Sequence, residues 1–299
     1  ASSYCMTQVA LPWMPIFSSI LPHETPLRAP SDAAWLRGIL AELRRSGETL
    51  DREIFDLLAK GDLTAAVRLL REDYDARKET LAEDEKVSKL LTLGALTFDH
   101  APGESIAFHK AVLDIAPEHF LAHVRLGELY YSQSEYVRAD LAFRRALEIG
   151  SPFRDQEVYA IIKHAASLTI EEKYDEAGAM LAAALAEAEA RGWDSLAMLA
   201  HNRIAYVALK RKDFEAAKRS LSAVIGFGRG AEHPDELGFA YSALGRIKID
   251  ERDFGEAKKL FDRSLEFELQ EGRPVGLADV YFYIGLIEIE LGDPARAQE

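Results

Sequence analysis

Apolar residues recur at three- and four-residue intervals over long stretches of the chain, and this spacing predicts amphipathic helices. In the stretch 122–146 the residues that follow it include Leu126, Leu129, Tyr130, Leu141 and Phe143. Alternation of apolar and polar residues between tight turns, which is typical of β-strands, is hard to find. The pattern therefore predicts an all-α protein.

The first thirty residues differ from the rest because they hold five of the 11 prolines. Each proline fixes φ and removes a backbone donor, so we expect residues 1–30 to form a proline-rich, non-helical arm. Trp13, Phe17 and Ile20 are costly to leave in water, and we expect this arm to dock on the body of the protein or on a partner. Its apolar stretch is too short and too interrupted to span a bilayer, and no basic flank marks it as a secretory signal.

A repeat of about forty residues organises the second half of the chain. In each unit an aromatic residue or proline is followed three residues later by alanine, and these alanines are 38, 40, 40 and 40 residues apart: Ala139, Ala177, Ala217, Ala257 and Ala297. Twelve residues before each alanine stands another small residue: Gly127, Ala165, Ala205, Gly245 and Gly285. Small residues on both helices of a pair allow a close crossing.

Two further positions recur in the same register. Four residues after the first four alanines comes a bulky apolar residue, namely Phe143, Leu181, Leu221 and Phe261, which we expect to fill the space within a helix pair. Three units place an aspartate before the aromatic residue or proline: Asp213, Asp253 and Asp293. A carboxylate there can cap the free N–H groups of the second helix.

These residues resemble the tetratricopeptide repeat, in which two helices per unit carry small, aromatic, alanine and bulky positions in this order. The resemblance covers residues 119–299, with the last unit truncated, and a weaker match over 31–118 predicts divergent helical repeats there. In that part Ala66 with Leu70 fits the template, and Phe108 with Ala111 fits its second half, which makes seven units. The resemblance implies a right-handed superhelical solenoid of antiparallel helix pairs. A period near forty is similar to the variants found in bacterial signal-sensing regulators and kinesin light chains.

The resemblance also implies a concave groove lined by the first helix of each unit. Carried over by register, the candidate partner-binding residues are Glu128, Tyr131, Asn202, Tyr206, Lys210, Ser242, Arg246 and Phe282. Aromatic and arginine side chains in a concavity are typical binding hot spots. For Val124, Ile162 and Leu286, which share the register, packing under the neighbouring helix is the favoured alternative. For Lys210 and Arg246 a solvated surface charge is an equal alternative.

The charge balance argues against nucleic acids and anionic membranes as partners. The chain has 36 basic and 50 acidic residues, a net charge of −14, and such a protein is repelled by nucleic-acid phosphates and anionic lipids. We therefore expect no nucleic-acid partner and no membrane insertion. The single cysteine, Cys5, cannot form an internal disulfide, which agrees with a cytoplasmic location.

No motif for catalysis, a metal or a cofactor is present. His119 and His123 have the spacing of zinc ligands, but they lack the acidic base of a metalloprotease motif, and a structural role is favoured. His164 falls at a position that packs inside a unit, where a hydrogen bond to a carbonyl is expected. The lysine and asparagine pattern of the clamp with which chaperone-binding repeats hold acidic C-terminal peptides is absent, so that kind of adaptor is disfavoured.

The sequence thus predicts a non-catalytic protein–protein interaction scaffold that holds a partner peptide or helix in its groove. The alternative is a ligand-sensing or regulatory module of a larger bacterial signalling protein. The apolar residues between Tyr281 and Leu291 also suggest a homodimer formed through an open C-terminal repeat.

Overall fold

A computed structural model of the protein describes residues 49–227, 234–271 and 274–292. The expected arm over residues 1–30 and the last second helix, which would begin at Asp293, lie outside the described residues. Every regular element within them is a helix: α3 (Thr49–Ala59), α4 (Leu63–Arg77), α5 (Glu83–Leu96), α6 (Pro102–Ile115), α7 (Phe120–Ser132), α8 (Tyr136–Ile149), α9 (Arg154–Ile170), α10 (Tyr174–Arg191), α11 (Asp194–Lys210), α12 (Phe214–Phe227), α13 (Pro234–Asp250), α14 (Phe254–Glu271) and α15 (Pro274–Glu290).

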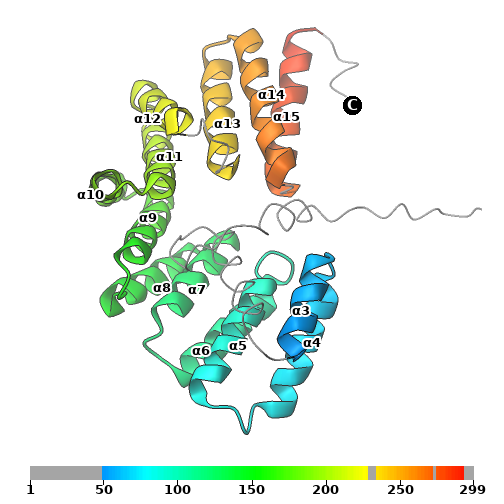
Figure 1. The fold of residues 1–299 in the computed structure, drawn as a ribbon. Helices are drawn as coiled ribbons and strands as arrows, with labels where there is room; N and C mark the ends of the chain where they lie inside the picture. The colour runs from blue at the N-terminus through cyan, green and yellow to red at the C-terminus, as the bar shows by residue number, and fades with distance from the viewer. Residues whose placement is uncertain (1–48, 228–233, 272–273, 293–299) are drawn as a thin grey trace, which may run out of the picture.

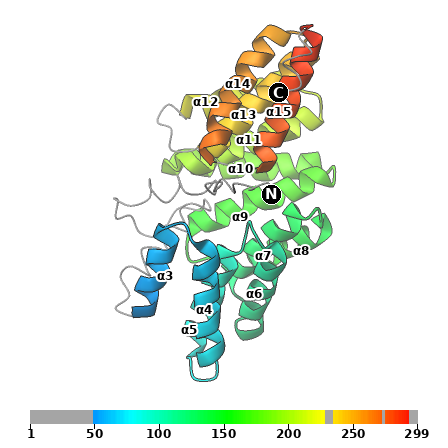
Figure 2. The same cartoon turned by 90° about the vertical axis from the view of Figure 1, so that its right-hand side faces the viewer.

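The helices form antiparallel pairs that stack in chain order, and this confirms the all-α repeat solenoid. Helices α3 with α4, α5 with α6, and so on to α13 with α14 pack as pairs, and each second helix also contacts the first helix of the next pair. From α7 onward the first helices contact one another as well. Figures 1 and 2 show the stack bending along its length, with α3–α6 at one end, α9–α12 in the middle and α13–α15 at the other end.

Six of the turns that follow a first helix share one conformation. Each has a residue with positive φ, between 59° and 84°, at the equivalent position: Gly61, Ser134, Glu172, Lys212, Arg252 and Gly292. The turn between α5 and α6, residues 97–101, has no such residue. At Lys212 the turn is closed by two backbone bonds, from Lys212 N–H to the Leu209 carbonyl (3.0 Å) and from Asp213 N–H to the Ala208 carbonyl (2.9 Å). This is a Schellman arrangement, which satisfies the free carbonyls at the end of the first helix.

The predicted capping aspartates are confirmed where they are described. The Asp213 carboxylate accepts a bond from the Ala216 amide (3.0 Å), and Asp253 accepts one from the Glu256 amide (3.2 Å). Asp62 caps α4 in the same way through the Ala65 amide (3.0 Å). The second helices α4, α12 and α14 therefore begin where a side-chain oxygen replaces the missing backbone acceptor.

The predicted close crossings are also confirmed. A Cβ atom added at Gly127 would lie 2.6 Å from the Phe143 ring, and one added at Gly245 would lie 2.6 Å from the Phe261 ring. Where the small residue is alanine, at Ala165 and Ala205, the facing bulky residue is the smaller Leu181 or Leu221, and all four are fully buried. The volume at each crossing is thus divided between two positions sixteen residues apart.

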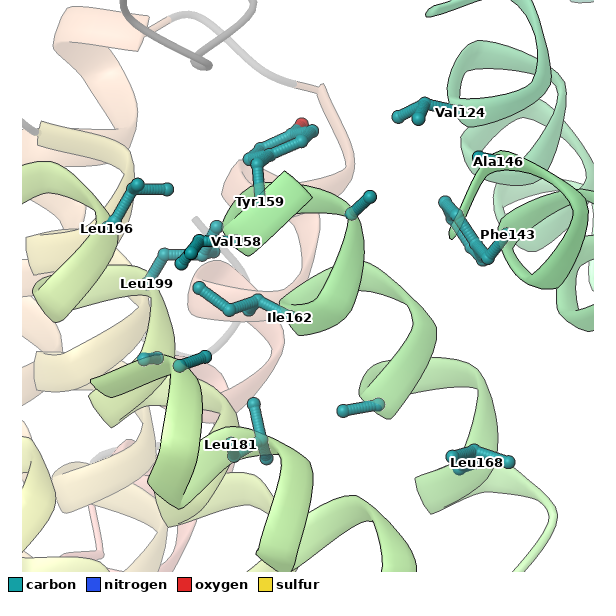
Figure 3. Close-up of a cluster of buried hydrophobic side chains, with 14 of the residues drawn as sticks. Val124, Phe143, Ala146, Val158, Tyr159, Ile162, Leu168, Leu181, Leu196 and Leu199 are labelled. Carbon is teal, nitrogen blue, oxygen red and sulfur yellow. The ribbon is translucent and has the colours of Figure 1, made fainter. Parts of the chain in front are cut away.

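The middle of the stack has a continuous apolar core. Figure 3 shows Val158, Ile162 and Leu199 gathered where α9 meets α11, with Phe143 directed from α8. Ile162 and Val124 are 0% and 1% exposed, so the expectation that they pack under the neighbouring helix is correct.

The register predicted for α6 is wrong by one residue. His109, not Phe108, occupies the fully buried bulky position, and its ring lies against Gly94 as the Phe143 ring lies against Gly127. Ser105 and Val112 then take the two small positions, both buried. The template misaligned because a buried histidine and serine stand where other units have a bulky apolar residue and alanine.

Candidate partner-binding face

The first helices present a common surface along the inner side of the curved stack. We call this surface the inner face, and we define it by side chains from α7, α9, α11, α13 and α15: Tyr131, Lys163, Arg203, Tyr206, Lys210, Phe239, Arg246 and Tyr283. Four of these residues, Tyr131, Tyr206, Lys210 and Arg246, are among those predicted from the register. The other four stand beside predicted positions or one turn away.

Helical spacing and the repeat bring these residues together. Arg203, Tyr206 and Lys210 stand three and four residues apart on α11 and so form one stripe. Arg246 takes on α13 the register position that Tyr206 takes on α11, forty residues earlier. Equivalent positions of adjacent first helices are neighbours, because α11 packs directly against α13.

Tyr131 links the α7 end of the inner face to α11. Its ring meets the Tyr136 ring edge-on, with the centroids 5.5 Å apart. Burial raises the pKa of the Tyr131 phenol, and the nearby Arg203 and Lys163 cations oppose this rise. Side chains from three consecutive first helices thus act on one another electrostatically, although they are up to 72 residues apart in sequence.

Four cations of the inner face lie over aromatic rings: Lys163, 5.0 Å from the centroid of Tyr159, and three cations on α11 and α13. The Lys210 ammonium is 5.3 Å from the centroid of Tyr206, and the Arg246 guanidinium is 5.5 Å from that of Tyr283. The Arg203 guanidinium is 5.8 Å from the centroid of Phe239 on the next first helix. Ring faces attract cations and hold them in place without neutralising their charge.

Glu128 is a predicted groove residue that the structure places inside the protein. It is 7% exposed, and its carboxylate accepts bonds from Arg125 (2.7 Å), from Lys163 (3.0 Å) and from the Tyr159 hydroxyl. Burial opposes ionisation of Glu128, but Lys163 and Arg125 overcome this effect and lower its pKa to about 2. The carboxylate is occupied by internal partners, so it supports the face and offers nothing to a ligand.

The remaining predicted residues have different surroundings. Asn202 is 1% exposed, and its amide nitrogen donates to the Glu236 carbonyl on α13 (2.9 Å), so it joins two units. Ser242 is half-buried. Phe282 is 62% exposed on α15, and its ring meets Tyr283 edge-on at 5.4 Å. Asn202 is thus an interface residue, whereas Phe282 is open to solvent.

Two cavities repeat along one edge of the stack. The larger, of about 490 Å³, is lined by Leu209, Lys212, Phe214, Arg246, Ile247 and Asp250. The smaller, of about 290 Å³, is lined by Ile249, Asp250, Arg252, Phe254, Leu286 and Glu290, most of which are the same positions one repeat later. Arg246 therefore borders both the inner face and an apolar hollow.

The histidines singled out by the sequence have structural roles. The His119 ring accepts a bond from the Ala122 amide (3.2 Å) at the start of α7, and the His123 ring is 2.9 Å from the Pro117 carbonyl. His164 is buried as predicted, but its Nε2 lies 2.8 Å from the Asp140 carboxylate, not from a carbonyl. Burial alone would raise the pKa of Asp140, yet hydrogen bonds from Arg144 and His164 hold it below its usual value.

Within the described ranges, no three histidine, cysteine, aspartate or glutamate side chains gather in a way that could hold a metal ion. The helices that can be described are all too short or too polar to cross a membrane. The cytoplasmic location stays a prediction.

Comparison with known proteins identifies the fold of this chain. No protein-family model matches the sequence, and no curated protein matches it significantly. A tetratricopeptide repeat protein from Parabacteroides merdae superposes with a TM-score of 0.58 at 16% identity, over 87% of this chain and 89% of that one. The chain has the tetratricopeptide-repeat fold.

Two other solved structures with this fold are a peptide complex and an ATPase with a sensor. The quorum sensor NprR in complex with its cognate peptide NprX gives a TM-score of 0.62 at 16% identity, over 89% of this chain and 82% of that one. A signal-transduction ATPase from Pyrococcus horikoshii, which has a tetratricopeptide repeat sensor, gives 0.57 at 15% identity, over 88% of this chain and 42% of that one. At such identities the likeness establishes the shared tetratricopeptide-repeat fold.

Four residues of the inner face were missed by the sequence reasoning. Arg125, Lys163 and Arg203 recur in one register position, directly after Val124, Ile162 and Asn202. A cation repeated in three successive units was a signal that could have identified the position. Phe239 and Tyr283 could not be found in this way. Their contribution is that a cation from the preceding first helix lies over each ring, and the sequence of one helix does not show this.

Proposed function

We propose that this protein is a non-catalytic scaffold that binds a partner peptide or helix on its inner face. One observation carries the proposal: aromatic and cationic side chains from consecutive first helices converge on one surface. Tyr206 offers a large aromatic contact area, and Lys210 and Arg246 carry charges that make no ion pair with a described residue. Tyrosine and arginine are enriched among the residues that dominate binding energies. The NprR complex shows that this fold can hold a peptide.

The test is affinity capture with the full chain as bait, followed by binding measurements on each captured partner. The variants Tyr206→Ala and Arg246→Ala are expected to weaken binding by about tenfold or more, as hot-spot truncations do. Arg263→Ala is the matched control, because Arg263 is an exposed arginine on the second helix α14 that pairs with Glu266 (2.6 Å). Unchanged binding of every partner by both inner-face variants would refute the assignment.

A second candidate is a sensing module within a larger signalling protein. The observation that favours it is the structural match to the Pyrococcus horikoshii ATPase with a repeat sensor. The match covers 42% of the ATPase chain. The sensor function predicts that a ligand changes the spacing between units, because only a differential contact can shift a conformational equilibrium. Small-angle scattering with and without a captured peptide tests this, and identical profiles would count against it.

A homodimer through α15 remains a proposal that rests on its exposed apolar side chains. Tyr281, Phe282 and Ile289 are 54%, 62% and 61% exposed. Sedimentation of the parent chain and of the Phe282→Ser variant tests it. A strict monomer at all concentrations would dismiss the dimer.

A further inference from the structure

The cations that lie over rings fall into two groups. Those of the first group also hold a carboxylate: Arg71 with Glu104, Arg125 with Glu128, Arg138 with Glu135, Lys163 with Glu128, Arg191 with Glu187, and Arg211 with Asp175. Those of the second group, Arg203, Lys210 and Arg246, make no ion pair with any residue that the structure describes. The second group is confined to α11 and α13.

The place of these three cations distinguishes them from other cations of the chain. Carboxylates are available, since the chain has 50 acidic residues against 36 basic ones, and on α13 itself Lys248 contacts Glu251 (2.8 Å). Exposed cations elsewhere, such as Arg68, Lys110 and Arg219, also make no ion pair with a described residue. The three cations of the second group differ because they lie together on the inner face, over rings of first helices.

The repeat register explains why carboxylates are missing there. Arg125 pairs with Glu128 three residues later on the same helix. The equivalent positions on α11 are Arg203 and Tyr206, and on α13 the position of Glu128 is occupied by Arg246. At this position the α7 unit has a carboxylate, the α11 unit has a ring and the α13 unit has a cation. Arg246 therefore adds to the charges of Arg203 and Lys210, and the three form a positive strip across two units.

The Arg203 side chain also lacks a hydrogen-bond acceptor in its own surroundings. Its Nε atom is buried and has no hydrogen-bond partner among the described residues. A buried donor without an acceptor is costly, and an arriving carboxylate would remove that cost at Arg203.

We infer that the inner face recognises an acidic peptide segment, whose carboxylates pair with Arg203, Lys210 and Arg246. This inference rests on the proposed function and names the chemistry of its ligand. The segment runs across α11 and α13, because the three cations lie on those helices and not along one of them. The rings of Tyr206, Phe239 and Tyr283 hold the cations in position and cover the apolar parts of the segment.

The experiment selects random peptides of roughly twelve residues, a length suited to groove binding, on the full chain. The same selection is made on the triple variant Arg203→Gln/Lys210→Gln/Arg246→Gln. The control is Arg138→Gln/Arg191→Gln/Arg211→Gln, which removes the same charge from cations that lie over rings and already hold carboxylates. Circular dichroism melting confirms that each variant is folded.

The expected result is enrichment of aspartate and glutamate in the peptides recovered by the parent and by the control, and its loss with the inner-face triple variant. The best peptide, synthesised with glutamine in place of its acidic residues, is expected to bind about tenfold weaker or worse. Its affinity for the parent should also fall as salt rises from about 50 to about 300 mM, because exposed charges are screened.

Two negative results are distinguishable. If the recovered peptides bind the Tyr206→Ala and Arg246→Ala variants as they bind the parent, the inner face is not the binding site and the proposed function fails with the inference. If binding depends on Tyr206 but the peptides carry no excess of acidic residues, the inference alone is overturned. A further variant, Tyr206→Glu, supplies Arg203 with the carboxylate that Arg125 has, and it should abolish selection of acidic peptides.

Discussion

The inner face is built differently at its two ends. Between α7 and α9, Arg125 and Lys163 both contact the buried Glu128 carboxylate, and the Tyr159 hydroxyl completes the cluster. Between α11 and α13, Arg203 and Arg246 stand over rings and contact no described carboxylate. The same repeat positions thus stabilise the stack at one end and leave charge available for a partner at the other.

This difference arises from a single register position. Glu128, Tyr206 and Arg246 are equivalent residues in three units, and the charge at that position changes from negative to neutral to positive. A repeat protein can therefore acquire a binding surface without altering its fold, because this position accepts a buried glutamate in one unit and an exposed arginine in another. Four predictions test how far the two ends differ in stability.

The largest effect is expected from Glu128→Gln, which removes the buried carboxylate that Arg125 and Lys163 both contact and should cost about 3 kcal/mol of unfolding free energy. Arg246→Gln, at the equivalent position, should change that free energy by less than about 0.5 kcal/mol. Urea unfolding followed by circular dichroism measures both. Equal losses would mean that the two ends do not divide stability and binding as described.

The second effect concerns pH at the Glu128 end. Burial lowers the pKa of His109 from 6.5 to about 4. The unfolded chain therefore takes up a proton near pH 6.5 that the folded protein does not accept until about pH 4. Stability should fall by about 2–3 kcal/mol as pH drops through this window.

The His109→Phe variant places a phenylalanine opposite Gly94, as Phe143 stands opposite Gly127. It should lose the His109 share of this pH dependence while it retains the fold. Unfolding midpoints measured at pH 7.5, 6, 5 and 4.5 for both proteins provide the comparison. A variant whose stability falls as steeply as that of the parent would show that His109 titrates normally.

The third effect tests what stabilises the α13 end in the absence of a buried ion cluster. Gly245→Ala directs a methyl group at the Phe261 ring, and overpacking of this kind should cost about 1–2 kcal/mol. Adding Phe261→Leu to this variant reproduces the alanine–leucine pair seen at Ala205 and Leu221, and it should restore much of the lost unfolding free energy. Additive losses in the double variant would contradict the shared-volume account of the crossings.

The smallest effect should be the same at both ends. Glu172 and Arg252 occupy the positive-φ position of their turns, with φ of 62° and 59°, where a side chain is strained. Glu172→Gly and Arg252→Gly should each stabilise the protein by about 0.5–1 kcal/mol. Thermal melting measures the gain, and the neighbouring Glu171→Gly, at an ordinary φ, is the control that should give none.

Much of this fold can be predicted from the sequence, because each repeat position has one physical requirement. Gly127 and Ala217 must be small, and Asp213 must offer an oxygen to free amides, so spacing alone identifies them. The shift of one residue at His109 shows the limit: the template expects an aromatic residue, and nothing local indicates that an imidazole with a backbone bond at 2.8 Å fills the same space.

The binding face was predictable only in part. Register places Tyr206, Lys210 and Arg246 on the first helices, and the structure has Lys210 over the Tyr206 ring and Arg246 over the Tyr283 ring. Register could not separate Glu128 and Asn202 from them, because burial of these two side chains depends on Lys163 and Glu236 of neighbouring units. The Arg125–Glu128 pair lies within one helix, but the contacts of Glu128 with Lys163 and of Asn202 with Glu236 join two helices, and the pattern of one helix does not contain them.

Because each helix pair touches only the pairs beside it, local opening of one pair disturbs only its own two interfaces. Hydrogen exchange in such a stack should spread from pair to pair instead of occurring in one step. A ligand that spans α11 and α13 would contact two pairs at once and would have to leave before either of them could separate. Slower exchange in both pairs together, and not in α3–α6, would therefore be the dynamic signature of an occupied inner face.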